Sequence, residues 1–442
     1  MKGIQFLLVC IGSMLCSFAI AAQPAAAASD AQTLANKIQG EVAEIRGLKF
    51  KRSIKASKQT PEEFGRYLDG QIKEGVPEAV SQHYGKIVQK LGLYRGPEIK
   101  DFASTMKSVM TSQAGAYYDP KTKTFYVLLE GLPEVMLGMF FAHELHHGLQ
   151  DQYFDLEKYM GMNQVKQTLD SDQRMARQAV VEGEATYIMN LWGIKSMTQG
   201  MPPRELMAPI VRMQSQMDMA QMQQMMQSPQ MEELGGDIKK SIDATAEIPA
   251  FILESLLGAY LKGMNFVFDV EAGGWSAVDK LYRDAPPEST EQILHPEKWS
   301  AGEKPVAIEW PAFSIPELKN WEVLDNDALG ELLWRVVFKE HGIDATSAND
   351  AAAGWNGDRY AVLKDKTSNA LLLLWRTSWD SAADAKEFAD AYRKVLSIKY
   401  EGKKEATRLV QSGTTVSIVE GGSEATIDAL LKFVDRAQER KR

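Results

Sequence analysis

Apolar residues recur every three or four positions through much of the first 300 residues, a spacing that predicts amphipathic helices. The pattern predicts helices over about 29–52 and 77–93, and a further helix across the apolar stretch 248–268. Between them, Thr60-Pro61-Glu62-Glu63 combines a capping residue, a proline in the first turn and a glutamate three residues later, as at the start of a helix. This part of the chain is therefore expected to be mainly helical.

Two short β-rich runs interrupt the helical pattern. Residues 116–118 and 124–128 are rich in tyrosine, threonine and valine, and a turn containing Asp119-Pro120 joins them. We expect a β-hairpin here. Two longer helices are then predicted at about 133–153 and 171–193.

Beyond a proline-rich stretch at 296–316, which is the expected linker, helices and strands are mixed. The predicted elements are helices near 327–340, 382–395 and 423–438, and strands near 359–364, 369–376, 405–411 and 414–419. This order is typical of an antiparallel sheet covered by helices. We therefore predict a main domain over 29–305 and a small C-terminal α+β domain over 306–442.

The first 28 residues have the pattern of an export signal. Lys2 supplies a positive charge, Ile4–Ile20 is apolar, and small residues follow, with Ala19-Ile20-Ala21 or Ala26-Ala27-Ala28 as possible cleavage sites. The alternative is a retained membrane anchor, but the run is short for a bilayer span. We expect cleavage, and no stable membrane span after it.

Both cysteines, Cys10 and Cys16, lie within this signal, so the mature protein has no thiol for a disulfide or for a metal. A cysteine-free exported chain fits a periplasm or the extracellular space equally well. The predicted localisation is therefore exported, either periplasmic or extracellular.

Composition and charge narrow the class of partner. The chain has 442 residues, 45% apolar and 25% charged, which is enough for a sizeable core and suggests two or three domains. A net charge of −9 argues against nucleic acid as the main partner. Oligomeric state is not predicted by any of these features.

Residues 197–231 hold ten of the 21 methionines. The first interpretation is a loosely packed helical insert in which methionine fills irregular gaps. A flexible lid or adaptable peptide-binding surface is a second, and thioether binding of Cu(I) is a third.

The candidate chemistry centres on His143-Glu144-Leu145-His146-His147, which holds three of the six histidines. Residues four apart lie on one face of a helix, so His143 and His147 can bind one ion. Glu144 then lies beside a zinc-activated water and can accept its proton. His146 points off this face and is expected at the surface or behind the ligands.

A catalytic zinc needs a third protein ligand. The best candidates are Glu182 and Glu184 on the next long helix. Because they are two positions, about 200°, apart on a helix, only one can face the ion. Glu182 is preferred over Glu184.

His-Glu-x-x-His followed by Glu-Gly-x-Ala on a later helix resembles the gluzincin branch of zinc peptidases. The resemblance implies Zn²⁺ bound by His143, His147 and Glu182, with Glu144 as general base. It also implies a zincin-like catalytic domain, so the expected fold is α+β, mainly helical, with the small C-terminal α+β domain appended. The expected substrate is a peptide or protein.

The chain further resembles a little-characterised group of exported bacterial proteins regarded as metallopeptidases, from about Arg46 to near the C-terminus. These segments carry the likeness: His143–Leu156, Val181–Thr186, Ser289–Lys298, Gly354–Tyr360 and Thr377–Asp380. They do not indicate what is cleaved.

One position departs from the gluzincin pattern, because Thr186 stands where an aspartate supports a ligand histidine in thermolysin. Support of this kind is general for histidine ligands. Asp151 and Asp172 are the candidates for it.

Peptide hydrolysis also needs a donor for the oxyanion. His295 is the first candidate for this catalytic role, and Tyr187 and Tyr260 are alternatives. Tyr117 and Tyr118 belong to the predicted hairpin, where an edge strand would pair with extended substrate in the gluzincin arrangement.

Two other functions remain open on sequence grounds. One is a non-catalytic binding or structural protein on a zincin scaffold, which the presence of Glu144 disfavours because a closed structural site has no use for a base. The other is a non-peptidic amide hydrolase, which would use the same metal chemistry.

Overall fold

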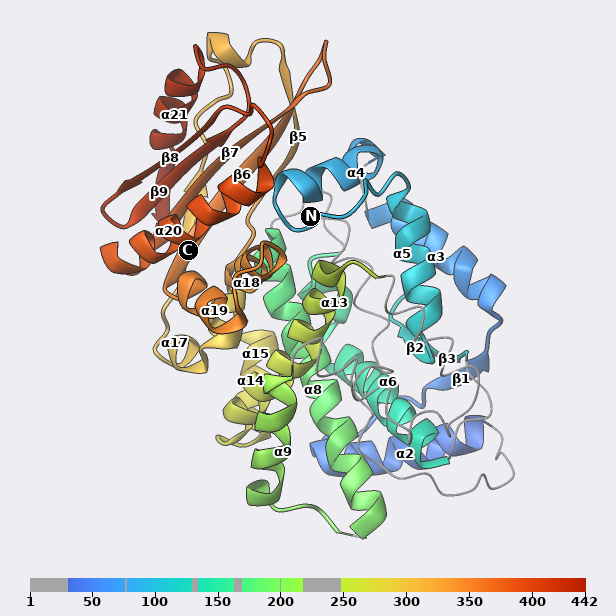
Figure 1. Cartoon of the computed structure of the whole chain (residues 1–442). Helices are drawn as coiled ribbons and strands as arrows, with labels where there is room; N and C mark the ends of the chain where they lie inside the picture. Colours follow the sequence, from blue (N-terminus) through green and yellow to red (C-terminus); the bar gives the residue numbers. More distant parts are fainter. Residues whose placement is uncertain (1–30, 76–77, 129–133, 163–168, 199, 218–247) are drawn as a thin grey trace.

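The computed structural model describes residues 31–442 except 76–77, 129–133, 163–168, 199 and 218–247 (Figure 1). The predicted signal and much of the methionine-rich stretch lie outside the described residues. The described fold is α+β and mainly helical, as predicted.

The first part of the chain is built from helices and one small sheet. Its helices are α2 (Ala31–Arg46), α3 (Pro61–Gly75), α4 (Glu78–Lys90), α5 (Phe102–Gln113), α6 (Glu134–Phe154), α7 (Leu156–Tyr159), α8 (Ser171–Thr198), α9 (Arg204–Gln216), α13 (Ala250–Leu257), the π-helix η2 (Gly258–Lys262), α14 (Gly263–Glu271), α15 (Trp275–Arg283), α16 (Thr290–Leu294) and α17 (Pro296–Ser300). Helix α3 starts with the predicted capping box: the Glu63 N–H donates to Thr60 Oγ1, and the Thr60 N–H donates to Glu63 Oε2.

The small sheet contains the predicted hairpin. Strands β2 (Ala116–Asp119) and β3 (Thr124–Val127) pair antiparallel, and β1 (Lys55–Lys58) adds a parallel strand beyond β3. Strand β1 was not predicted, because Lys-Ala-Ser-Lys has no alternating apolar pattern.

Helices α8 and η2–α14 cross with their backbones in direct contact. A Cβ atom added to Gly183 would lie 2.1 Å from the Gly263 carbonyl carbon, and one added to Gly263 would lie 2.0 Å from the Ala179 carbonyl oxygen. Only glycine allows this approach. The glycine between Glu182 and Glu184 therefore sets how closely α8 packs.

The C-terminal part is an antiparallel sheet with helices on both faces. Its elements are β4 (Val306–Glu309), η3 (Pro316–Leu318), β5 (Trp321–Asp327), α18 (Glu331–Glu340), α19 (Ala345–Ala352), β6 (Trp355–Asp365), β7 (Leu371–Trp379), α20 (Ala382–Lys399), β8 (Thr407–Ser412), β9 (Thr415–Glu420), α21 (Ile427–Asp435) and β10 (Gln438–Lys441). The five-stranded sheet has the order β5-β6-β7-β9-β8, and β10 pairs with β4. Ala361 and Leu363 pack with α21, whereas Tyr360 and Val362 belong to the core on the opposite face. Helix α19 and strands β4, β5 and β10 were not predicted.

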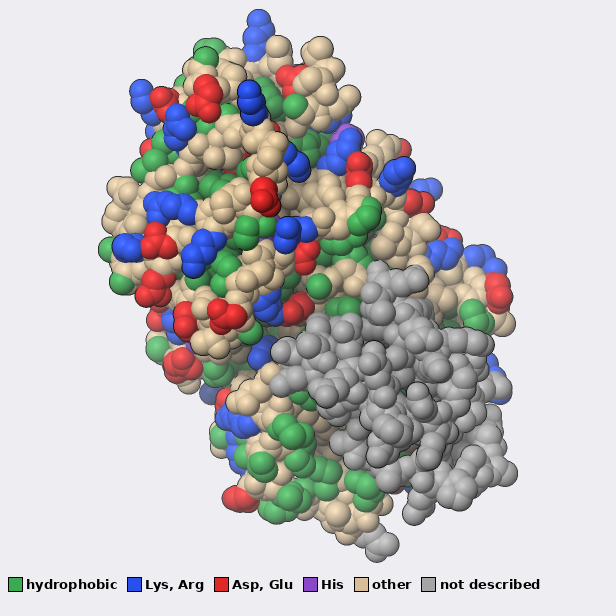
Figure 2. Space-filling model, viewed as in Figure 1, with side chains coloured by type: hydrophobic (Ala, Val, Ile, Leu, Met, Phe, Trp, Pro, Cys, Tyr) green, Lys and Arg blue, Asp and Glu red, His purple; other side chains and the backbone are tan. Residues whose placement is uncertain are grey.

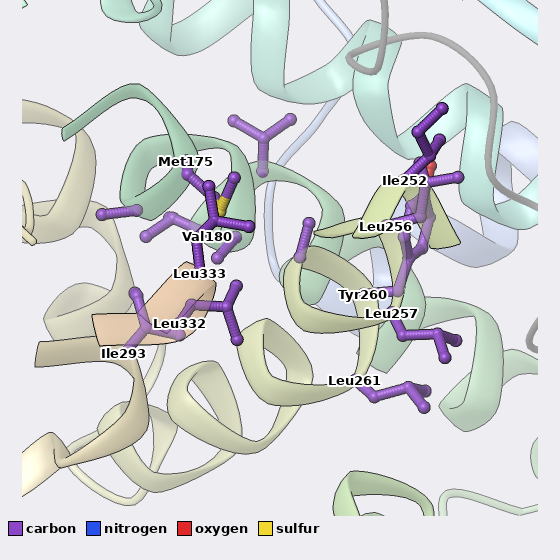
Figure 3. Close-up of a cluster of buried hydrophobic side chains, with 14 of the residues drawn as sticks. Met175, Val180, Ile252, Leu256, Leu257, Tyr260, Leu261, Ile293, Leu332 and Leu333 are labelled. Atoms are coloured by element: carbon purple, nitrogen blue, oxygen red, sulfur yellow. The ribbon is translucent and has the colours of Figure 1, made fainter. Parts of the chain in front are cut away.

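A single core crosses the predicted boundary near residue 305. Figure 3 shows buried side chains of α8 and α18 close together, with those of α13 and η2 beside them. The labelled residues are Met175, Val180, Ile252, Leu256, Leu257, Tyr260, Leu261, Ile293, Leu332 and Leu333. The expected linker 296–316 contains α17 and β4 and does not divide the buried apolar side chains into one core on each side.

Among the described helices, the continuous stretch Ala250–Glu271 has the length and apolar composition to cross a membrane. However, 83% of its most apolar window is buried inside the molecule, as in a core helix. On the face drawn in Figure 2, acidic and basic side chains are intermixed over the described surface.

Candidate metal centre

Helix α6 brings His143 and His147 to one buried face, as their spacing predicts. Their exposed fractions are 0% and 4%, their ring planes stand 86° apart, and their Nε2 atoms are 3.1 Å apart. Polar side chains are rarely this buried without partners. The two imidazoles therefore form a polar centre inside the helical part of the molecule.

Glu182 on α8 completes the centre. Its Oε2 atom lies 3.2 Å from His143 Nε2 and 3.3 Å from His147 Nε2. Three ligands around a tetrahedral zinc, each about 2.0–2.1 Å from the ion, stand about 3.3–3.4 Å from one another. The three atoms thus have the spacing of one face of a zinc coordination sphere.

The second carboxylate oxygen of Glu182 also fits a metal site. Among the described residues, Glu182 Oε1 has no hydrogen-bond partner, although it is buried. A buried atom without a partner is costly unless a ligand or water satisfies it. Glu182, with two nitrogen lone-pair donors beside it, offers the donor set that Zn²⁺ prefers.

The two imidazoles of this centre differ in their pKa values. Burial lowers the pKa of His143 to about 4. Burial also opposes protonation of His147, but the Glu182 carboxylate outweighs it and raises the pKa of His147 to about 9. The same imidazolium keeps the pKa of Glu182 below its usual value despite burial. Without metal, a proton on His147 therefore balances the carboxylate.

Glu144 lies next to the three converging atoms. His143, Glu144 and His147 each offer an atom within 4.8 Å of the others. The backbone N–H of Tyr118, in β2, donates to Glu144 Oε2 at 2.9 Å. Strand β2 thereby holds the carboxylate of the expected general base from the side of the small sheet.

Glu184 faces away from the two imidazoles, so the preference for Glu182 agrees with the geometry. Arg46 Nε donates to Glu184 Oε1 at 2.5 Å, and both side chains are buried. His146 is buried too, with Nε2 3.3 Å from Glu184 Oε1, and burial lowers its pKa. A surface position for His146, one of its two expected places, is therefore wrong; it lies behind the ligand helix.

The hydrogen-bond partner of His147 is a residue that the sequence did not lead us to expect. His147 Nδ1 lies 2.8 Å from Gln150 Oε1. The candidates Asp151 and Asp172 have other partners: Asp151 accepts from Tyr118 Oη and Lys123 Nζ, and Asp172 accepts from Thr290. The available signal was the spacing, because Gln150 follows His147 by three residues on the same helix.

Of the three oxyanion candidates, the structure brings Tyr260 to the histidines. Its ring stacks on that of His143, with centroids 5.7 Å apart and planes 20° apart. It lies in η2, and π-helical turns are frequent at functional sites.

The other two candidates have different surroundings. Tyr187 packs edge-on against Phe268, with Trp275 beside it. His295 lies at the junction of α16 and α17, 27% exposed, with Nε2 3.0 Å from Glu331 Oε1. No contact of His295 with His143 or His147 occurs in the described residues, so its expected oxyanion role has no support in the geometry.

The hairpin tyrosines have different places. Tyr117 is fully buried and stacks between Tyr67 and Tyr126, so it is a core aromatic residue. Tyr118 donates its backbone N–H to Glu144, and its hydroxyl group donates to Asp151.

A second group of acids, Glu291, Glu303 and Asp380, also converges. Lys298 Nζ lies among them, 2.6 Å from Glu291 Oε1 and 2.7 Å from Glu303 Oε1, and it also binds Asp380. This group therefore already contains a cation, the Lys298 ammonium, that the protein itself supplies.

Comparison with known proteins covers only the C-terminal part. Residues 321–431 match a family model described as Domain of unknown function (DUF8575), which falls within the predicted C-terminal domain and excludes the histidine cluster. No curated protein and no solved structure matches the chain.

Proposed function

We propose that the protein is an exported zinc metallopeptidase whose metal is held by His143, His147 and Glu182. The observation that carries this proposal is the triangle of Nε2, Nε2 and Oε2 atoms with edges of 3.1–3.3 Å, which has the dimensions of a zinc ligand set. The C-terminal family match neither supports nor opposes it.

When bound, zinc supplies a water activated near neutral pH and polarises the carbonyl under attack. Glu144 accepts the proton of that water and delivers it to the leaving nitrogen. The Tyr118 N–H keeps one oxygen of Glu144 in place for this transfer. Tyr260, beside His143, is the candidate donor to the developing oxyanion.

The presence of Glu144 favours catalysis over a purely structural ion. A structural zinc site is closed by four protein ligands. Here Glu144 lies beside the ligands, but its Oε2 already accepts from Tyr118, as expected for a positioned base. A non-peptidic amide hydrolase would share these residues, and substrate tests separate it from a peptidase.

The decisive experiment compares wild type with Glu144→Gln. Zinc content is measured by metal analysis, and hydrolysis is measured on casein and on a peptide library. The variant should keep zinc and its fold but lose at least about a hundredfold in rate, the usual contribution of a general base. Glu62→Gln, an exposed position at the start of α3, is the matched control.

Equal hydrolysis by wild type and Glu144→Gln would overturn the peptidase mechanism. Wild-type protein that keeps no more zinc than His143→Ala would overturn the metal site itself. Cleavage of small amides but of no peptide would move the proposal to an amide hydrolase.

A further inference from the structure

Gln150 accepts a hydrogen bond from the distal nitrogen of a ligand histidine, and its own orientation is controlled by a buried network. The network consists of Gln150 on α6, Glu184 and Val181 on α8, Tyr282 on α15 and Arg46 at the end of α2. All these side chains are at most 8% exposed. It links four helices behind the candidate metal centre.

The network determines which way the Gln150 amide points. Its Nε2 group lies 3.0 Å from the Val181 carbonyl oxygen, 2.9 Å from Glu184 Oε2 and 2.8 Å from Tyr282 Oη. The Tyr282 hydroxyl donates to Glu184, so its oxygen is available as an acceptor. Three acceptors face the two amide hydrogens, and a flipped amide would turn its oxygen toward all three.

The amide oxygen must therefore face His147. Because Gln150 Oε1 can only accept, the hydrogen of the 2.8 Å contact belongs to His147 Nδ1. A neutral imidazole with its hydrogen on Nδ1 has its lone pair on Nε2. Nε2 is the atom that faces His143 and Glu182.

Arg46 holds the Glu184 carboxylate of the network in place. Its guanidinium binds Glu184 Oε1 through Nε at 2.5 Å and Asp279 Oδ1 through Nη2 at 2.6 Å. Both oxygens of Glu184 are therefore engaged as acceptors: Oε1 accepts from Arg46, and Oε2 accepts from Gln150 and from Tyr282.

We propose that Gln150 is a positioning residue that sets the Nε2-binding tautomer of His147, and that the Arg46–Glu184 pair holds Gln150 in the required orientation. This inference rests on the proposed zinc site. It assigns a role to Glu184 and accounts for Thr186 at the position of a supporting aspartate: the support comes from the ligand helix itself, while Thr186 donates to the Glu182 carbonyl.

The test measures zinc affinity by competition with a chromophoric chelator, with folding followed by circular dichroism. Gln150→Leu should weaken zinc binding about 10–100-fold, the usual effect of removing a partner of a ligand histidine. Gln152→Leu is the matched control, two residues along the same helix, where the amide bonds only to the Lys51–Arg52 segment among the described residues. It should change the affinity less than threefold.

The exchange variant Gln150→Glu/Glu184→Gln separates positioning from packing. It keeps an acceptor for His147 Nδ1 and conserves the net charge, so zinc affinity should return to within about threefold of wild type. Imidazole ¹⁵N spectra of the metal-free protein, recorded at high pH where His147 is neutral, give a second readout. His147 should carry hydrogen on Nδ1 in wild type and in the exchange variant, with a mixture of tautomers in Gln150→Leu.

The outcomes decide the inference separately from the proposed function. Folded Gln150→Leu with wild-type zinc affinity overturns the inference and leaves the metal site standing. If Gln150→Leu does not fold, the exchange variant decides: restored affinity supports positioning, and lost affinity overturns it. Wild type with no zinc affinity beyond that of His143→Ala overturns the proposed function instead.

Discussion

Two groups of ionisable side chains converge in the described part of the chain, and they differ in the cation that can balance their carboxylates. Around Glu291, Glu303 and Asp380, carboxylates meet around Lys298, which already fills the place of a cation. Around His143, His147 and Glu182, two imidazoles meet one carboxylate, and no lysine or arginine contacts the three converging atoms among the described residues.

Converging acids alone therefore do not indicate a metal site. A lysine ammonium is a compact cation that satisfies several carboxylates at once. Imidazole nitrogens offer lone pairs that coordinate Zn²⁺ well. A lysine ammonium is a poorer partner for them. The chemical identity of the donors, together with the presence or absence of an internal cation, separates the two groups.

The largest expected effect is on metal affinity. His143→Ala should lower zinc affinity by more than about a thousandfold, because the proposed three-ligand site loses one of its ligands. Equilibrium dialysis with metal analysis measures this. Glu291→Gln, in the lysine-filled group, is the counterpart and should leave zinc binding unchanged; zinc loss in this variant would break the comparison.

Substitutions of the two glutamates of α8 should differ in whether they mainly change zinc affinity or the stability of the fold. Glu182→Gln should reduce zinc affinity about a hundredfold or more while the protein stays folded, since the amide is a poor ligand. Glu184→Gln should mainly destabilise the fold, by about 3 kcal/mol, because it leaves buried Arg46 without its closest carboxylate. Its loss of zinc affinity, which acts only through Gln150, should be smaller than that of Glu182→Gln. Urea unfolding and zinc titration of both variants measure the two effects; reversed outcomes would exchange their assigned roles.

The loss of stability caused by removing the Lys298 ammonium should depend on pH. Burial raises the pKa of Glu291 to about 8, although Lys298 opposes the rise. Because an unfolded glutamate titrates near 4.5, the folded state binds this proton more tightly, and stability falls as pH rises from about 4.5 to 8. Lys298→Met removes the opposing charge and should deepen this fall, lowering Tm more at pH 8 than at pH 5.

The control for that measurement is Lys304→Met, since Lys304 is half-exposed and only 3.9 Å from its nearest acid. It should shift Tm by less than about 2 °C at either pH, as expected for a surface pair. An equal Tm loss for Lys298→Met at both pH values would show that Glu291 does not titrate in this range.

The smallest expected effect is a proton count. The pKa of His147 is about 9 without metal, so this imidazole is protonated at pH 7.5, and zinc must displace the proton. Binding should release about one proton at pH 7.5 and progressively less above pH 9, and affinity should rise with pH over this interval. Calorimetry in buffers of different ionisation enthalpy counts the protons, and a count of zero at pH 7.5 would show a neutral His147.

Local pattern predicted the elements that carry the site. The helices at 133–153 and 171–193 and the hairpin before them appear as α6, α8 and β2–β3, because helical periodicity and turn chemistry act over a few residues. The shared face of His143 and His147 follows from helix geometry alone. The glycine between Glu182 and Glu184 was visible in the sequence, but its role in the crossing of α8 and η2–α14 was not.

The contacts between residues at the site and behind it depend on tertiary packing. The contacts of Glu182 with His143, of Arg46 with Glu184 and of Tyr118 with Glu144 join residues 39, 138 and 26 positions apart. No local preference encodes such pairings, because they depend on how whole helices pack. The same holds for β1, whose polar residues become a strand only where β3 offers a free edge, and for His295, which packing places beside Glu331.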